Sequence, residues 1–339
     1  MGKLKFKHLT FLVLSLVVII IPRFNWGEVG PLKPFVGTIP FDIEQYISYT
    51  EFFRGEMDEN TQLEGPFVYR PLTPLLASFL PFDALTSINL VNLIVLLLTL
   101  IPLVKTLQLL KFKSNYVFIG GILFVYSFPL FYYGTSGYID SVLIGFIMTA
   151  VYLMLSNKII LFFVVFALGV GVKETIVILV PVFAIYLFFQ SNFSLKKNIS
   201  ILLLLILVYS VCTILVRNIT PESETYIWFP YLEVILDNLV RPKTYLSILL
   251  TFGIPGIGAL LYINVALRKQ SFISQQPALV TGLIVSMLIS FFSLFAAYAD
   301  GRHIWTSYPF TIPLAVAYIK YFRERKILFP AISQIDLHQ

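Results

Sequence analysis

The sequence TSINLVNLIVLLLTLIPLVKTLQL (86–109) decides the fold class of this chain. The run is apolar and long enough to cross a bilayer as one helix, which takes roughly 20 residues. Within lipid every backbone polar group needs a partner inside the protein, and a continuous apolar run meets this condition as an α-helix. A membrane β-barrel would instead show short segments of alternating polarity. The run therefore predicts a transmembrane helix and an all-α fold.

Apolar composition extends this prediction to the whole chain. Of its 339 residues, 58% are hydrophobic and 12% are charged, and the mean hydropathy is +0.86. Because a water-soluble protein carries roughly 25% charged residues, the composition indicates a polytopic membrane protein, with one transmembrane domain over residues 1–339. We expect about ten transmembrane helices. Besides 86–109, the apolar runs lie near 9–22, 115–133, 138–156, 158–172, 175–190, 198–217, 244–266, 277–298 and 303–320.

The basic residues predict which side of the membrane each loop faces. Alternation of the spans places the Lys and Arg clusters at 3–7, 111–113, 196–197, 268–269 and 320–326 on one side. By the positive-inside rule this side is the cytoplasm. We therefore expect both termini to be cytoplasmic. Because no small-residue cleavage site follows the run 9–22, the first helix is expected to stay uncleaved, and the expected location is the inner (plasma) membrane of a bacterium. The net charge of +6 belongs to these loops, so no nucleic-acid partner is expected.

Two large loops are predicted on the outer side, at 23–85 and 218–243. In the first, helical spacing of apolar residues predicts a juxtamembrane helix over 41–53, lying along the membrane surface. The residues expected on its apolar face are Phe41, Gln45, Tyr49 and Phe52. The segment 67–81 is apolar but carries three prolines, which favours a second surface-lying or re-entrant helix over a full span.

Asp42 is the candidate catalytic residue on the first surface helix. Because it follows Pro40 near the predicted helix start, its carboxylate could cap the helix. Held over the membrane surface, the same carboxylate could accept a proton from a hydroxyl nucleophile or bind a divalent cation. Glu44 could share that cation, although it points to a different face of the helix. The sequence leaves these roles open and names no other cofactor.

Arg70 and Lys173 are candidate phosphate ligands. The Arg70 guanidinium can bind two phosphate oxygens, or simply reach the headgroups with its stem in lipid. Lys173 and Glu174 interrupt an apolar region. Because adjacent helical residues do not face one another, each must find a partner elsewhere. A plain loop between two short helices is the alternative.

Two further polar breaks complete the candidate set. Asp140 opens a predicted helix, where the helix dipole favours an acid, so capping and substrate binding are both open. Arg302 stands at the entrance of the last predicted helix and is another candidate phosphate ligand. Its neighbour His303 could transfer a proton at neutral pH or be a hydrogen-bonded structural residue. Since all these breaks face one compartment, they predict a shared polar site.

The order of these motifs resembles the GT-C superfamily of integral-membrane glycosyltransferases. That superfamily has a large first outer loop with an acidic residue and juxtamembrane helices, followed by short polar motifs at later helix junctions. The matching segments here are Asp42…Tyr46, Tyr69-Arg-Pro-Leu-Thr-Pro74, Gly137-Tyr-Ile-Asp140, Lys173-Glu-Thr175 and Arg302…Pro309.

The resemblance implies an inverting transferase that moves a monosaccharide, a hexose or a pentose, from a polyprenyl-phosphate donor to an acceptor at the outer face. Asp42 would be the base, and Arg70, Lys173 and Arg302 would hold the phosphate. The other implied substrate-binding residues are Glu44, Tyr46, Asp140, Glu174 and His303. The implied partners are this donor and membrane lipids. A transporter or flippase of a lipid-linked or anionic solute is the alternative, because the same cations would suit a translocation pathway.

Overall fold

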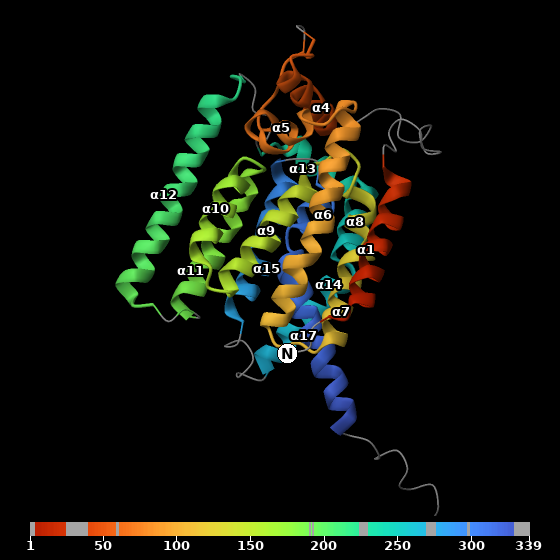
Figure 1. Ribbon diagram of the computed structural model, residues 1–339, viewed down its shortest axis with the longest axis vertical. Coiled ribbons are helices and arrows are strands. Elements are labelled where there is room, and N and C mark those ends of the chain that lie inside the picture. Colours follow the sequence, from red (N-terminus) through yellow and green to blue (C-terminus); the bar gives the residue numbers. More distant parts are fainter. Residues whose placement is uncertain are drawn as a thin grey trace, which may run out of the picture.

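The computed structural model describes residues 4–24, 40–58, 61–189, 191, 193–223, 230–268, 276–296 and 299–328. In this part of the chain the regular elements are helices, and no strand is present (Figure 1). The all-α prediction is therefore confirmed. The central stretches of both outer loops, 25–39 and 224–229, lie outside the described residues.

Five of the described helical segments are long and apolar enough to cross a membrane. They are α1 with its 3-10 extension η1 (Phe6–Ile20, Ile21–Arg23), α6 (Ala84–Leu109), α12 (Leu195–Ile219), α14 (Pro242–Arg268) and α15 (Pro277–Ala296). Shorter apolar helices are α7 (Ser114–Val125), α9 (Asp140–Leu155), α10 (Ile159–Val170) and η3 with α11 (Glu174–Ile178, Leu179–Phe189). The chain is a multi-pass membrane protein. The count of about ten spans stays a prediction.

Two runs that were predicted as single continuous helices are each divided into two helices. The run 115–133 is divided into α7 and α8 (Phe128–Tyr133), with Pro129 in the first turn of α8. A proline inside a helix removes a hydrogen bond and clashes with the carbonyl four residues before it, so the helix restarts at this point. The run 303–320 likewise starts as a separate short helix, α16 (Arg302–Trp305), before α17 (Tyr308–Leu328).

The helices form a bundle with α9 at its centre and α12 at its edge (Figure 1). Most side chains of α9 are buried, because α6, α10, α11 and α17 pack around it. In contrast, most of the apolar side chains of α12 are exposed, as expected of a helix that faces lipid. The buried start of α9 thereby brings Asp140 to the middle of one end of the bundle.

The surface helix α4 (Phe41–Arg54) covers this end, together with η2 (Phe67–Tyr69) and α5 (Leu72–Ser78) (Figure 1). The extent of α4 agrees with the prediction, but its predicted apolar face is partly wrong. Gln45 and Tyr49 are buried, whereas Phe41 and Phe52 are 42% and 39% exposed. Because α4 packs on α5 and α6, the buried stripe is shifted by about one residue around the helix. The buried residues of α4 are Ile43, Gln45, Tyr46, Tyr49 and Thr50.

The segment predicted to form a second helix over 67–81 is helical only over η2 and α5. Pro71 stands before α5 as its N-cap residue and separates it from η2. Arg54, at the end of α4, fastens this region by donating hydrogen bonds to the carbonyl oxygens of Ala77 and Leu80 and to Ser87 Oγ.

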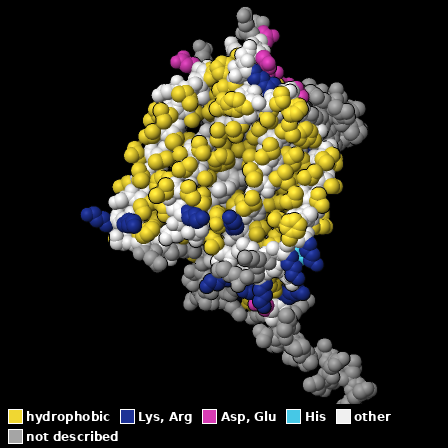
Figure 2. All heavy atoms as spheres, in the orientation of Figure 1, with side chains coloured by type: hydrophobic (Ala, Val, Ile, Leu, Met, Phe, Trp, Pro, Cys, Tyr) yellow, Lys and Arg dark blue, Asp and Glu magenta, His cyan; other side chains and the backbone are white. Residues whose placement is uncertain are grey.

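Charged side chains of opposite sign gather at opposite ends of the molecule. Figure 2 shows Asp and Glu at the end that carries α4, and Lys and Arg mainly at the other end, with a band of hydrophobic side chains between them. We call the end with α4 the outer end, following the predicted orientation. The band between the ends suits the hydrocarbon core of a bilayer.

Candidate active site

Charged side chains from five segments meet at the outer end of the bundle, and we call them the outer charge cluster. Its members are Asp42 on α4, Arg70 after η2, Asp140 on α9, Lys173 and Glu174 at η3, and Asp300 and Arg302 at α16. Three ion-paired groups make up the cluster, and we describe them in turn.

Asp42 and Arg302 form the first group. Asp42 Oδ2 lies 2.5 Å from Arg302 Nη2, and Asp300 Oδ1 lies 3.3 Å from Arg302 Nε. The N-cap residue of α4 is Pro40, and Asp42 stands in the first turn. Asp42 is therefore not the N-cap residue, although an acid in the first turn is favoured by the helix dipole, which was the electrostatic part of the capping interpretation. Its side chain is 21% exposed, so it remains accessible beside the buried guanidinium.

The backbone around Arg302 explains its fixed position. Asp300 Oδ1 accepts a hydrogen bond from the Arg302 N–H at 3.0 Å, and the guanidinium stacks 4.3 Å from the ring centre of Tyr138. Gly301 donates its N–H to Ser247 Oγ on α14 at 3.1 Å. A Cβ atom on Gly301 would overlap Thr251 Oγ1 and the Ser247 carbonyl, so only glycine allows this approach of α16 to α14.

Lys173 and Asp140 form the second group. Lys173 Nζ donates to Asp140 Oδ1 at 2.7 Å, and both side chains are at most 5% exposed. Arg302 and His303 also lie within electrostatic reach of Asp140. The Asp140 carboxylate thus connects the first group with the second.

Arg70 and Glu174 form the third group. The guanidinium binds the Glu174 carboxylate through two nitrogens, one of them Nε at 2.9 Å from Oε2, and Nη1 donates to Tyr46 Oη at 2.8 Å. Phe67 covers the guanidinium at 5.4 Å. Arg70 is 1% exposed, so its side chain lies inside the protein and does not reach out to lipid headgroups. Burial raises the pKa of the Tyr46 phenol above its ordinary value, and Tyr46 is therefore neutral at physiological pH.

The prediction that Lys173 and Glu174 find separate partners is confirmed by these pairs. Lys173 turns to α9, and Glu174 turns to the loop after η2. The two residues do stand at a junction between the short helices α10 and α11, and their side chains connect α9 and the first outer loop to the same cluster.

His303 and Glu44, the two other candidate residues, differ in exposure, since His303 is buried whereas Glu44 is exposed. His303 is buried, and burial together with the nearby cations Arg302 and Lys173 lowers its pKa well below the ordinary value, so the imidazole is neutral at physiological pH. Glu44 is exposed on α4. In the described residues no group of three or more His, Cys, Asp or Glu side chains could hold a metal ion, and the Arg302 guanidinium occupies the place between Asp42 and Asp300.

The charges of the cluster are nearly balanced, with four carboxylates against three cations. Burial raises the pKa of the Asp300 carboxyl, and its own partner Arg302 opposes this shift. Each cation that was predicted to bind phosphate therefore already holds a carboxylate. An anionic ligand therefore competes with these carboxylates for the cations.

Two asparagines that support the site were not singled out in the sequence. Asn89 Oδ1 accepts the Gly137 N–H at 2.7 Å, and Asn92 Nδ2 donates to the Tyr138 carbonyl at 2.6 Å. Both are completely buried on α6 and hold the loop that leads to Asp140. Their position three residues apart in the apolar run 86–109 is the signal that could have found them, because polar side chains in a membrane helix need buried partners.

The fold is similar to that of known membrane enzymes, while the sequence is not. No family model and no curated protein matches this chain. The crystal structure of the Archaeoglobus fulgidus oligosaccharyltransferase in the apo form aligns with a TM-score of 0.55 and 13% identity over 95% of this chain and 51% of its own. The structure of AglB from the same organism, in complex with an inhibitory peptide and a dolichol-phosphate, aligns with a TM-score of 0.54 and 12% identity. This alignment covers 97% of this chain and 52% of the AglB chain.

These likenesses show a shared fold, as the resemblance to the GT-C superfamily led us to expect. The chain spans about half the length of the two structures that it matches. Nearly the whole of this chain is aligned in both comparisons.

Proposed function

We propose that this protein is an inverting glycosyltransferase that moves one hexose or pentose from a polyprenyl-phosphate donor to an acceptor at the outer face of the membrane. The observation that carries the proposal is Asp42, a partly exposed carboxylate fixed by buried Arg302 at the outer end of a GT-C fold. The dolichol-phosphate in the similar AglB complex supports a lipid phosphate as partner.

In the proposed reaction Asp42 is the general base. The acceptor hydroxyl oxygen attacks the anomeric carbon and forms the new glycosidic bond, while the bond from that carbon to the phosphate oxygen breaks. The hydroxyl proton passes to Asp42, and polyprenyl phosphate leaves with the bonding electrons. Such a positioned base contributes about 10² to 10⁴ in rate. Single displacement inverts the configuration, as the resemblance implies.

The donor phosphate would be held by Arg70, with Lys173 and Arg302 stabilising its developing negative charge. Glu174 is the cluster carboxylate best placed to give way, because its side chain is 41% exposed whereas Arg70 is buried. A phosphate can accept the same pair of parallel hydrogen bonds from a guanidinium as a carboxylate does. Two of the three remaining carboxylates, Asp42 and Asp300, would favour the positive charge that develops on the sugar ring.

The substitution Asp42→Asn tests the proposal. The amide keeps an oxygen for Arg302 and removes the proton acceptor, so we expect transfer to fall by about 100-fold or more while donor binding persists. The assay uses the full chain in nanodiscs, polyprenyl-phosphate hexose or pentose labelled in the sugar, and cell-envelope extract as the source of acceptor. Glu51→Gln, on the same helix but outside the cluster, is the matched control.

Wild-type transfer by Asp42→Asn would contradict the assignment of the base and move it to Glu44 or Asp140. A transporter or flippase would instead move the intact labelled donor across a vesicle membrane without forming a new glycosidic bond. The geometry favours transfer over transport, because the described ion pairs gather at the outer end of the helices and not at mid-membrane.

A further inference from the structure

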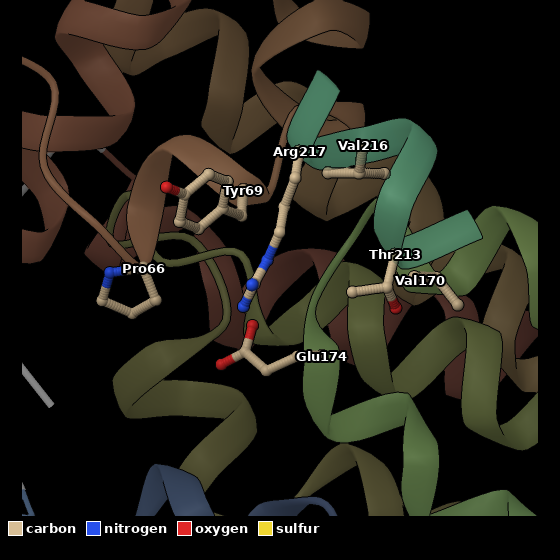
Figure 3. A pocket seen from close by; sticks show the side chains of 7 residues that line it. All are labelled: Pro66, Tyr69, Val170, Glu174, Thr213, Val216 and Arg217. Carbon is tan, nitrogen blue, oxygen red and sulfur yellow. The ribbon is translucent and has the colours of Figure 1, made fainter. Parts of the chain in front are cut away.

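A small pocket lies between the outer charge cluster and the peripheral helix α12 (Figure 3). Its lining residues are Pro66, Tyr69, Val170, Glu174, Thr213, Val216 and Arg217. The volume of about 50 Å³ has room for roughly three to five water-sized groups. This space suits the oxygens of one phosphate group and is too small for a sugar ring.

Two charged side chains face each other across the pocket. Figure 3 shows Arg217 extending from α12 toward the Glu174 carboxylate, beside the Tyr69 ring. The Arg217 guanidinium lies 5.3 Å from the centre of that ring, a cation–π distance. Among the described residues Arg217 makes no ion pair within 4 Å, and Glu174 is already bound through two nitrogens by Arg70.

The charge around the pocket favours an anion. The Glu174 carboxylate is bound by Arg70, and in the described part of the chain Arg217 has no carboxylate of its own within 4 Å. An arginine is the side chain best suited to chelate two phosphate oxygens, and its partial stacking on Tyr69 orients the guanidinium in advance.

The position of the pocket indicates where such an anion comes from. Arg217 is in the last turn of α12, and its neighbours Ile214, Leu215 and Ile219 are exposed apolar side chains. These side chains suit contact with lipid tails, while the guanidinium lies at the outer end of the helix. A phosphate that reaches the pocket from this side is carried by a membrane lipid.

We propose that this pocket is a binding subsite for the phosphate group of a membrane lipid, with Arg217 as its ligand. Glu174 separates the subsite from Arg70, so a lipid phosphate held by Arg217 waits directly next to the cluster. The inference concerns binding alone and stands whether or not the protein transfers sugar.

The test measures binding to the full chain in phosphatidylcholine nanodiscs. The probes are a polyprenyl monophosphate, phosphatidylglycerol and inorganic phosphate, each titrated against wild type, Arg217→Gln and Lys243→Gln. Lys243 is an exposed cation of the outer end that does not line the pocket, so it matches the charge change. We expect Arg217→Gln to weaken binding of the polyprenyl monophosphate roughly tenfold or more, because a charge-assisted hydrogen bond is lost, and Lys243→Gln to leave it within about twofold.

The lipid probes distinguish the source of the phosphate. If Arg217→Gln loses equal affinity for both lipids, the subsite binds any phosphate-bearing lipid. If it loses affinity for the polyprenyl monophosphate alone, the subsite is specific for the carrier of the proposed donor. The proposal is overturned if Arg217→Gln binds all probes like wild type, if Lys243→Gln loses as much affinity, or if only inorganic phosphate responds. Loss of transfer in Asp42→Asn has no bearing on these outcomes, so the two proposals fail separately.

Discussion

The substitution Lys173→Met should destabilise the protein by leaving Asp140 buried without its ammonium partner. Both side chains are at most 5% exposed, and removal of one member of such a pair costs about 3–5 kcal/mol. Arg302 lies within electrostatic reach of Asp140 and offsets part of the cost, so we expect about 3 kcal/mol. With an unfolding entropy of about 2.1 cal/mol/K per residue, a chain of 339 residues loses roughly 1.4 °C per kcal/mol, or about 4 °C in Tm.

The assay is thermal unfolding followed by tryptophan fluorescence in one detergent at fixed pH. Lys158→Met, an exposed lysine at the opposite end of α9, is the control and should change stability by less than about 0.5 kcal/mol. The double variant Lys173→Met/Asp140→Leu should recover most of the lost stability, because apolar side chains of similar volume replace the whole pair. A Tm of Lys173→Met equal to the control, or a double variant worse than the single one, would refute the reasoning.

Two further predictions concern α16 and the orientation of the chain. Gly301→Ala should cost about 1–3 kcal/mol and weaken donor binding, because the new methyl group overlaps Thr251 on α14, whereas Gly171→Ala meets only ordinary contacts and serves as control in the same unfolding assay. In a cysteine-free background, Glu56→Cys should react with a membrane-impermeant maleimide from outside the cell, and Lys111→Cys only after permeabilisation; labelling of intact cells at Lys111→Cys would reverse the assigned orientation.

The extent of most helices was predictable from the sequence, because an apolar run has to be buried in lipid or in the protein core along its whole length. The runs 86–109 and 198–217 correspond within a few residues to α6 and α12. The break at Pro129 has a local contribution, because a proline lacks the N–H that continues a helix, but a proline alone does not decide it, since Pro102 stands inside the unbroken α6. Which face of α4 is buried was not local information, because the stripe depends on where α5 and α6 lie against it.

The candidate site was predictable as a set of residue types on one side, and less so as a set of contacts. Adjacency alone required Lys173 and Glu174 to diverge. The sequence does not indicate that Lys173 pairs with Asp140 while Glu174 pairs with Arg70, because these partners are 33 and 104 residues away along the chain. The sequence also suggested cations ready for phosphate, whereas the folded chain supplies each with a carboxylate.

By itself the sequence determined that this is an all-α, multi-pass membrane protein with its acidic side chains concentrated at one end, because hydrophobic length and charge sidedness are properties of the chain before it folds. Only the tertiary structure decided that Asp42 binds Arg302, that Arg70 is buried, and that Arg217 faces Glu174 across a pocket. The physical reason is that a buried charge must be compensated by whichever opposite charge the packed helices bring within reach, and helix packing is a property of the whole bundle.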